Sequence, residues 1–477
     1  MTNDDLTTIL HRWLGPVGDD LPELYAVGGA VRDHLLGRPL RDVDLACRNA
    51  AGFARLLADC QEKPATVVPF TRDRDAPCFR VVNRRRPEDF VDVVNLRGPT
   101  IEDDLERRDF TINAMAFRIL PDGRLGDLID CVNGGRDLGD RLIRACGSRA
   151  LGDDPARVLR AARLSAQLDF SVTPDTRDAM AQQAARLTGV AAERLTAELL
   201  KLLSCPRCLL QVRLLDETGV LGVILPEISA AKGCRQNGYH HLDVWEHSLA
   251  TLAACEEIIA GPEAAFGRAG PAVRSFLDQN NHLPLLKLAA LLHDLGKPRV
   301  KQYDQEKERV TFHGHDRRGA ELAAVAAGRL RFSSADTRLL TLMVEQHMRP
   351  VILFQPQVKQ STIIKWFREV NDASLLIMLL AMADVAAKSG ERMARETKEN
   401  FFAWARKETI NYTEYLKKTF GQPSLVSGRD LLALGLAPGP AIGRILADIR
   451  EQQDLGLITD RDHALRLLRD ALNLLTY

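Results

Sequence analysis

The sequence predicts an α+β chain, in which a mixed head of strands and helices is followed by helical segments only. Over roughly the first 150 residues, short apolar runs end at glycine turns or alternate with polar residues, as strands do. From Asp153 onward, Ala, Leu and Arg recur at helical spacing. The length of 477 residues fits two to four domains. We expect the parts to span residues 1–150, 151–232, 233–400 and 401–477.

The head begins with a strand that runs into a glycine turn. Leu24–Val27 is apolar and leads to Gly28 and Gly29, and the following segment, Ala30–Leu36, has a helical pattern closed by another glycine. Asp42–Ala46 alternates with the period of a strand. Further strands are expected at Thr66–Phe70, Phe79–Asn83 and Phe90–Val94, whereas the apolar stretch Ile112–Leu120 fits either type of element.

Composition and charge exclude several classes of protein. Lys plus Arg and Asp plus Glu each number 64, so the net charge of +0 excludes binding of a polyanion by bulk charge but allows a local basic face. The nine cysteines are scattered, unlike a secreted disulfide framework. The N-terminus is polar and acidic, and the longest apolar run, Leu375–Ala387, is short for a membrane span and contains Asp384. We therefore expect a cytoplasmic enzyme without a membrane partner.

The segment GGAVRD, Gly28–Asp33, follows the first expected strand and opens a helix. Glycine lets the backbone approach a ligand closely, and the N–H groups at a helix start face an anion. Arg32 adds a side chain suited to a bidentate phosphate contact. Because glycine pairs are common in ordinary turns, this motif alone leaves a plain turn as the alternative.

Three aspartates form a candidate magnesium site. Asp42 and Asp44 are two residues apart on an expected strand, so both carboxylates lie on one face. Mg²⁺ prefers carboxylate oxygens together with substrate phosphates, and it removes the repulsion between close carboxylates. Asp92 supplies a third carboxylate if its strand lies alongside. The chemistry that fits is phosphoryl transfer, and the alternative is a solvated strand edge.

A charged helix follows the head. Asp154, Arg157, Arg160 and Arg163 step by three residues, which places them on one slowly rotating helix face. The three arginines suit a triphosphate, and Asp154 together with Arg157 suits the edge of a base. A salt-bridged solvent face is the alternative.

Five stretches carry a family resemblance: GGAVRDHLLGRPLRDVDLA, RRDFTINAMA, DCVNGGRDLGDRLIRACG, DDPARVLRAAR and ERLTAELLKLL. In this order they resemble the motifs of class II tRNA nucleotidyltransferases and bacterial poly(A) polymerases. The resemblance implies a polymerase-β-like nucleotidyltransferase head, a helical neck, Mg²⁺ on Asp42 and Asp44, and selection of CTP or ATP without a nucleic-acid template. The nucleotide-binding residues that it implies are Gly28, Gly29, Arg32, Arg108, Asp109, Asn113, Asp154, Arg157, Arg160 and Arg163.

Histidines and aspartates gather in the third part of the chain, at the ends or middles of apolar helices. A single buried histidine is more often a satisfied core residue, but several unpaired ones are costly, and such a set suits a divalent metal. The candidates are His247, His293, Asp294, His315, His347 and Asp384. Their pattern resembles the HD phosphohydrolase domain. This resemblance implies that His247, His293, Asp294 and Asp384 bind a transition metal or Mg²⁺, and that His315 and His347 match the extra histidines of two-metal versions.

The two resemblances together imply an enzyme that adds CMP, AMP or both to the 3′ end of tRNA, with phosphatase or 2′,3′-cyclic phosphodiesterase activity in the HD domain. The connection between Asp92 and Arg107 is short, which leaves open a specialist that adds only CC. A poly(A) polymerase is the close alternative, and an HD phosphohydrolase whose head only binds nucleotide or RNA is the alternative from another class. The oligomeric state and the role of the helical tail stay open.

Overall fold

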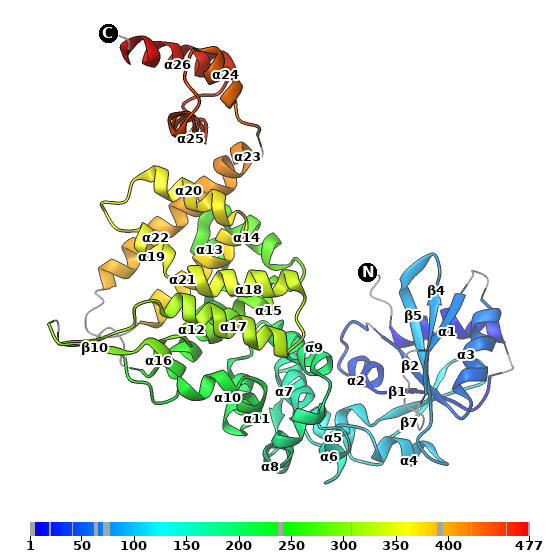
Figure 1. Ribbon diagram of the computed structural model, residues 1–477. Coiled ribbons are helices and arrows are strands. Elements are labelled where there is room, and N and C mark those ends of the chain that lie inside the picture. The colour runs from blue at the N-terminus through cyan, green and yellow to red at the C-terminus, as the bar shows by residue number, and fades with distance from the viewer. Residues whose placement is uncertain are drawn as a thin grey trace. The chain divides into compact units, whose positions relative to one another are not determined.

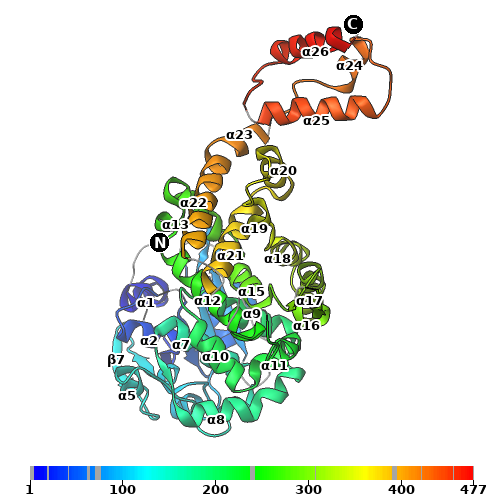
Figure 2. The same ribbon diagram turned by 90° about the vertical axis from the view of Figure 1, so that its left-hand side faces the viewer.

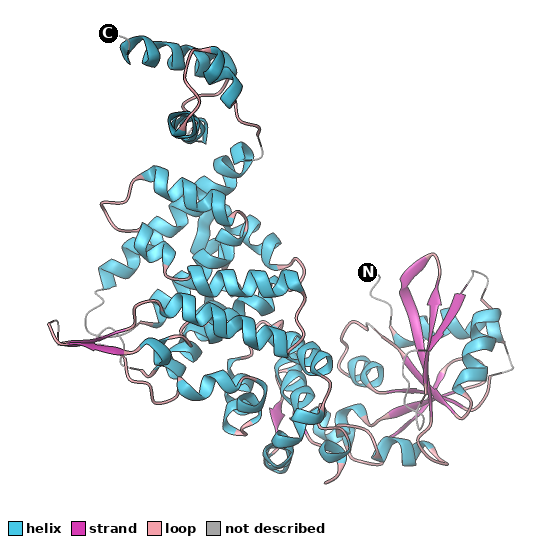
Figure 3. Cartoon of the chain, in the orientation of Figure 1, coloured by secondary structure: helices cyan, strands magenta, loops and turns pink. Residues whose placement is uncertain are grey.

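The computed structural model describes residues 5–18, 21–40, 42–61, 65–69, 77–236, 242–306, 308–388, 395–420, 422–454 and 456–475. The chain divides into two compact units, the first formed by residues 1–198 and 210–224 and the second by residues 199–209 and 225–477. The main sheet lies in the first unit, and the second unit is almost wholly helical (Figure 1, Figure 3). The predicted α+β class is confirmed.

A seven-stranded sheet forms the core of the first unit, with the strand order β3-β4-β5-β2-β1-β6-β7. Neighbouring strands are antiparallel except for β2 and β5, which run parallel. Val27, Leu45 and Val93 are fully buried, so the apolar side chains of the central strands supply the core. The strands are β1 (Leu24–Val27), β2 (Asp44–Cys47), β3 (Ala65–Pro69), β4 (Cys78–Asn83), β5 (Arg86–Asn95), β6 (Ala116–Ile119) and β7 (Leu125–Ile129).

The expected strands are all present within the described residues, with differences at their ends. The strand expected at Asp42–Ala46 begins only at Asp44, and Asp42 lies in the extended segment before it. The strand expected at Phe90–Val94 is much longer, because it forms a hairpin with β4. The apolar stretch Ile112–Leu120 contains the end of a short 3₁₀ turn, Thr111–Asn113, and then strand β6. Phe70 lies outside the described residues.

Helices cover the sheet and continue into the neck. They are α1 (Leu6–Leu14), α2 (Gly29–Leu35), α3 (Ala50–Asp59), α4 (Ile101–Glu106), α5 (Gly134–Gly139), α6 (Ala150–Asp153), α7 (Arg157–Leu168), α8 (Pro174–Gln183), α9 (Ala192–Leu203), α10 (Leu209–Glu217) and α11 (Val220–Ile224). Two short parallel strands, β8 (Leu142–Ile143) and β9 (Ser171–Val172), lie between them. Helix α7 buries Val158, Leu159 and Ala162, as its spacing predicts.

The second unit is built around helices α12 and α21, which pack against each other and against α15. Its helices are α12 (Val244–Ala260), α13 (Pro262–Phe266), α14 (Gly270–Leu277), α15 (His282–Leu292), α16 (Lys297–Val300), α17 (His315–Arg329), α18 (Ser334–Gln346), α19 (Arg349–Leu353), α20 (Gln360–Val370), α21 (Ala373–Ala387), α22 (Arg395–Asn411) and α23 (Lys417–Phe420). A hairpin of β10 (Gln302–Asp304) and β11 (Arg309–Thr311) interrupts them. Helices α24 (Gly428–Ala433), α25 (Pro440–Asp454) and α26 (Arg461–Leu475) share a small apolar core of their own (Figure 2).

Within the part of the chain that the structure describes, no single helix has the length and apolar character of a membrane span. Helices α20 and α21 reach that length and composition only as a pair, across a bend of 115°. Helix α21 is apolar because it lies at the centre of the unit, where Leu376–Ala383 are all buried.

A buried ion pair holds the segment around Cys205 in place within the second unit. Lys287 Nζ donates to the carbonyl oxygens of Cys205 at 2.6 Å and Pro206 at 3.1 Å, and it lies 3.1 Å from Glu256 Oε1. Glu256 Oε1 also accepts from the backbone N–H of Cys208 at 2.7 Å. Cys205 and Cys208, which are spaced as Cys-x-x-Cys, are both buried next to this ion pair, as expected for a structural role.

Replacing Lys287 with methionine should lower the free energy of unfolding by about 3–5 kcal/mol, because Glu256 then stays buried without its counter-charge. The measurement is the midpoint of urea unfolding of the full chain. Lys365→Met is the matched control, because it removes a lysine from the exposed ion pair of Lys365 with Glu369. Replacing Lys287 and Glu256 together with methionine should recover part of the loss, since no charge is then left unpaired. A midpoint equal to that of the wild type in Lys287→Met would contradict this reading of the pair.

Candidate functional site

Strand pairing brings the head carboxylates together. In the parallel pair β2·β5, Asp44 lies directly opposite Asp92, and Val27 of β1 lies opposite Asp44 on the other side. Asp42 is two residues upstream and exposed, whereas Asp92 is 5% exposed. The glycine turn after β1, the two motif aspartates and the third carboxylate therefore lie close together on the central strands of the sheet.

Gly28 occupies a position that only glycine fills without strain. Its φ is +74°, and a Cβ there would lie 3.1 Å from Arg108 Nη1 and 3.3 Å from Asp44 Oδ2. Arg108 is held by two hydrogen bonds to Asp104 Oδ2, at 2.9 and 2.8 Å. The backbone turn thus packs directly against a guanidinium and a carboxylate of the candidate site.

Asp92 has a partner that sequence reasoning missed. Arg80 on β4 donates from Nε to Asp92 Oδ1 and from Nη2 to Asp92 Oδ2, both at 2.8 Å. The same guanidinium lies 3.9 Å from the centre of the Phe90 ring. Only the cross-strand register of Arg80 with Asp92 reveals this pair, and no local motif signals it.

A chain of hydrogen bonds joins the glycine turn to helix α7. Arg32 Nη1 donates to Asn113 Oδ1 at 2.6 Å, and Asn113 Nδ2 donates to Asp109 Oδ1 at 3.1 Å. Asp109 Oδ2 accepts from Arg160 Nη1 at 3.1 Å. Burial raises the pKa of Asp109, but the positive charge of Arg160 and the hydrogen bond from Asn113 lower it further, so this pKa lies below its ordinary value. Four of the predicted nucleotide-binding residues therefore form one network.

The sequence places Asp154 on the helix face of the arginines, but α7 begins at Arg157 and Asp154 lies before it with extended backbone angles, so that prediction is wrong for Asp154. The other predicted residues contact protein groups, and Arg163 shares Glu198 with Arg160. Arg157 is buried and donates to the backbone carbonyls of Ala150, Arg107 and Arg108. Asp154 Oδ2 lies 2.8 Å from Arg194 Nη2, and Arg163 Nε lies 2.6 Å from Glu198 Oε2. Arg194 and Glu198 were missed, although both lie in the stretch ERLTAELLKLL, whose charged residues at helical spacing were the available signal.

The charge environment of Asp44 suits a divalent cation. Burial, with Asp92 and Asp42 nearby, raises the pKa of Asp44 to about 6. Carboxylate oxygens crowded in this way are the ligands that Mg²⁺ prefers, so Asp42 and Asp44 fit the ion that the motif implies.

The raised pKa of Asp44 predicts a pH dependence. A carboxyl group whose folded pKa lies above its ordinary value binds its proton more tightly in the folded state, so stability falls as pH rises from about 4 to about 6. In the absence of metal, the free energy of unfolding should fall by about 2 kcal/mol over this range, relative to Asp44→Asn. Thermal unfolding of both proteins across the range tests this. Parallel curves for the two proteins would show that Asp44 titrates normally.

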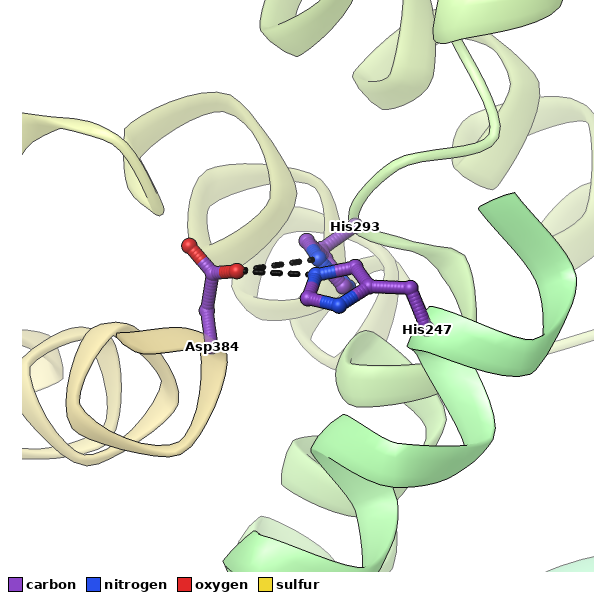
Figure 4. A group of neighbouring side chains, drawn as sticks. All are labelled: His247, His293 and Asp384. Atoms are coloured by element: carbon purple, nitrogen blue, oxygen red, sulfur yellow. Dashed lines mark hydrogen bonds and ion pairs between the residues drawn. The ribbon is translucent and has the colours of Figure 1, made fainter. Parts of the chain in front are cut away.

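The second unit contains a cluster of six side chains, called here the histidine–aspartate cluster: His247, His293, Asp294, His315, His347 and Asp384. They come from α12, the end of α15, α17, the end of α18 and α21. His247 Nε2 lies 2.9 Å and His293 Nε2 lies 3.8 Å from Asp384 Oδ1, and both imidazoles point toward that oxygen (Figure 4). All six predicted ligands are therefore brought together.

Three of the imidazoles are oriented by the backbone. The Nδ1 atoms of His293, His315 and His347 lie 2.6–2.9 Å from the carbonyl oxygens of Ala290, Phe312 and Val344. With the Nδ1 proton held there, each Nε2 presents a lone pair to the interior of the cluster. Among the described residues, His293 Nε2 is buried without a hydrogen-bond partner. This nitrogen faces the carboxylates of Asp294 and Asp384, and an inward-facing imidazole nitrogen beside carboxylates is what a metal ligand requires, so the cluster fits a divalent ion.

Asp294 lies between two candidate metal positions. Its Oδ2 is 3.2 Å from His293 Nε2 and 3.6 Å from His247 Nε2, whereas its Oδ1 is 3.4 Å from His315 Nε2 and 3.7 Å from His347 Nε2. Ligand atoms of His247, His293 and Asp384 form one compact group, and those of His293, Asp294 and His347 form another. Burial lowers the pKa of His347 to about 3, which keeps that imidazole neutral.

Comparison with known proteins agrees with this division of sites. Residues 24–144 match the poly A polymerase head domain, residues 169–232 match the "probable RNA and SrmB-binding site of polymerase A", and residues 244–402 match the HD domain. The chain is 34% identical over 441 residues to the A-adding tRNA nucleotidyltransferase of Deinococcus radiodurans, covering 91% of this chain and 92% of that protein. It is 32% identical over 450 residues to the CC-adding tRNA nucleotidyltransferase of Thermus thermophilus, covering 93% and 92%.

Solved structures share the fold at lower identity. The CCA-adding enzyme of Thermotoga maritima in complex with tRNA matches with a TM-score of 0.64 at 22% identity, covering 99% of this chain and 97% of that one. A CCA-adding enzyme with CTP matches with a TM-score of 0.63 at 22% identity, covering 99% and 100%. Fold and sites together define a nucleotidyltransferase head joined to a helical HD region. By its similarity to the curated relatives, the chain belongs to the tRNA nucleotidyltransferase family.

Proposed function

We propose that this enzyme adds CMP, AMP or both to the 3′ end of tRNA, using CTP and ATP and no nucleic-acid template. One observation carries the proposal: Asp44 lies opposite Asp92 and beside the Gly28 turn. Asp42 is two residues before Asp44. The relatives named A-adding and CC-adding support the same substrate class.

Residues of the head and of the neck that follows it have roles in this reaction. Asp42 and Asp44 would hold Mg²⁺, which activates the RNA 3′-hydroxyl and neutralises the triphosphate when bound. Gly29, Arg32 and Arg108 bind the triphosphate, and Asp154 with the arginines of α7 reads the base and its phosphates. Asp109 and Asn113 hold Arg32 and Arg160 in place through the hydrogen bonds described above. The third carboxylate, Asp92, is oriented by two hydrogen bonds from Arg80.

The histidine–aspartate cluster supports a second activity. We assign to it the hydrolysis of a phosphomonoester or a 2′,3′-cyclic phosphodiester, with a transition metal or Mg²⁺ that activates water when bound. The inward-facing Nε2 atoms of His293 and His347 and the two-sided position of Asp294 favour this assignment over a structural histidine cluster. The proposed division of the chain is a head (1–150), a neck (151–232), an HD domain (233–400) and a helical tail (401–477).

The experiment that tests the head supplies tRNAs that end before the first C, after one C and after two. Each is incubated with labelled CTP or ATP and Mg²⁺, and the products are sized. Incorporation of CMP alone identifies a CC-adding enzyme. Incorporation of AMP, and only on the tRNA that ends in CC, identifies an A-adding enzyme. Incorporation of both nucleotides identifies a CCA-adding enzyme. Long A tails on any RNA would identify a poly(A) polymerase, and no incorporation would overturn the proposal.

A further inference from the structure

A lysine outside the motifs of the histidine–aspartate cluster contacts one of its carboxylates. Lys388 lies one helical turn after Asp384, and its Nζ is 2.6 Å from Asp384 Oδ2. The side chains are 10% and 2% exposed, so water screens this pair poorly. The other oxygen, Asp384 Oδ1, faces His247 and His293. The carboxylate of Asp384 therefore contacts the Lys388 ammonium with one oxygen and faces a candidate metal position with the other.

Asp294 is also paired with a buried lysine, although here the lysine and two histidines share one carboxylate oxygen, Oδ2. Lys297 Nζ lies 2.6 Å from Asp294 Oδ2 and also donates to Gln236 Oε1 at 2.7 Å. Two buried carboxylates are thus matched by two buried lysines, and the cluster has no net charge while its histidines are neutral. Without such counter-charges, two carboxylates in the interior would be strongly destabilising. The lysines explain how the cluster folds before a metal arrives.

The geometry points to a role for Lys388 in metal loading: we propose that it is a positioning residue that weakens binding of the divalent ion held by His247, His293 and Asp384. It does so because its ammonium opposes the positive charge of that ion across a single carboxylate. The charge it keeps beside the loaded site attracts a phosphoester, so Lys388 lowers metal affinity and favours substrate binding at once. The substrate half of this inference rests on the proposed hydrolase function, whereas the metal half does not.

Two observations distinguish this role from simple helix capping. Asp384 lies between the two groups, because its Oδ2 is 2.6 Å from Lys388 Nζ while its Oδ1 is 2.9 Å from His247 Nε2, so the ammonium and the candidate metal position share one carboxylate. Lys388 is the residue directly after α21, whereas Asp384 lies inside that helix, so the helix keeps Asp384 in place when the lysine head group is removed. If Lys388 had only a structural role, its replacement would lower metal affinity, because Asp384 would then be less well placed.

The test measures metal affinity directly. The full-length protein is titrated with Co²⁺, followed by its visible absorption, in excess Mg²⁺ that occupies the carboxylate-only head site. His293→Ala supplies the baseline without the cluster. Lys388→Met, which keeps the length and the apolar stem, should bind Co²⁺ at least about tenfold more tightly with unchanged stoichiometry, because one opposing buried charge is gone. Lys388→Arg keeps the charge and should match the wild type, as should the exposed control Lys365→Met.

Hydrolysis supplies the second readout. With saturating Co²⁺, Lys388→Met should raise KM for a phosphomonoester by about tenfold and change kcat less, because a phosphate-attracting charge is lost. Unchanged or weaker Co²⁺ binding in Lys388→Met would overturn the inference, whatever the hydrolase result. Tighter Co²⁺ binding without any hydrolysis in the wild type would support the metal role and refute the hydrolase function. Normal nucleotide addition by Lys388→Met confirms that this variant is folded. If Lys388→Met is insoluble, Lys388→Gln is measured in its place.

Discussion

Replacing Asp42 and Asp44 together with alanine is expected to abolish nucleotide addition while phosphoester hydrolysis continues. Asp44 begins β2, where it lies opposite Asp92 of β5, and Asp42 is two residues upstream; in the proposed reaction Asp42 and Asp44 provide the ligands for Mg²⁺. Loss of the ion removes about 4 kcal/mol or more of transition-state stabilisation, so addition should fall at least about a thousandfold. Labelled CTP and ATP incorporation into tRNA measures the first activity, and release of phosphate from a phosphomonoester measures the second.

The double variant needs a control that removes an aspartate from the same sheet without touching the site. Asp127→Ala serves, because Asp127 is exposed on the edge strand β7. We expect it to add nucleotides at the wild-type rate. Persistent addition in the Asp42→Ala/Asp44→Ala protein would show that the reaction uses another set of ligands. Loss of both activities, with altered unfolding, would instead indicate misfolding, and Asp44→Asn then tests the site with a smaller change.

The converse change is His293→Ala, which should eliminate hydrolysis and spare addition. His293 is fully buried, and its Nε2 lies 3.2 Å from Asp294 and 3.8 Å from Asp384, so its removal takes a ligand from both candidate metal positions. Bound transition metal, measured by elemental analysis of the purified protein, should fall together with the hydrolase rate, again by at least about a thousandfold.

His313→Ala is the matched control for this change, because His313 is exposed and lies two residues before His315. It should keep both the metal and the hydrolase activity. Hydrolysis that survives in His293→Ala would place that activity elsewhere in the chain. A protein that loses addition as well as hydrolysis would show that the cluster supports the fold, so the ratio of the two activities is the decisive quantity.

The sequence by itself determined the class of the head, and it predicted the aspartates of the candidate magnesium site and the members of the histidine–aspartate cluster. These rest on residue types at short spacing, such as GGAVRD, the pair Asp42 and Asp44, and His293-Asp294. A strand or helix turns such spacings directly into a shared face or a ligand pair. Lys388 also falls in this group, since its i, i+4 spacing from Asp384 is visible in the sequence, although its meaning is not.

Only the tertiary structure decided which charged groups hold these residues. Arg80 binds Asp92 because β4 pairs with β5 in one register, and Arg194 on α9 binds Asp154, which lies 40 positions earlier in the chain. Arg157 has the spacing of an exposed arginine, yet it is buried and bonded to backbone carbonyls of residues about fifty positions earlier. The start of β2 at Asp44, too, depends on where its neighbours pair. Such partners are set by packing between segments far apart in the chain, and local spacing contains no information about them.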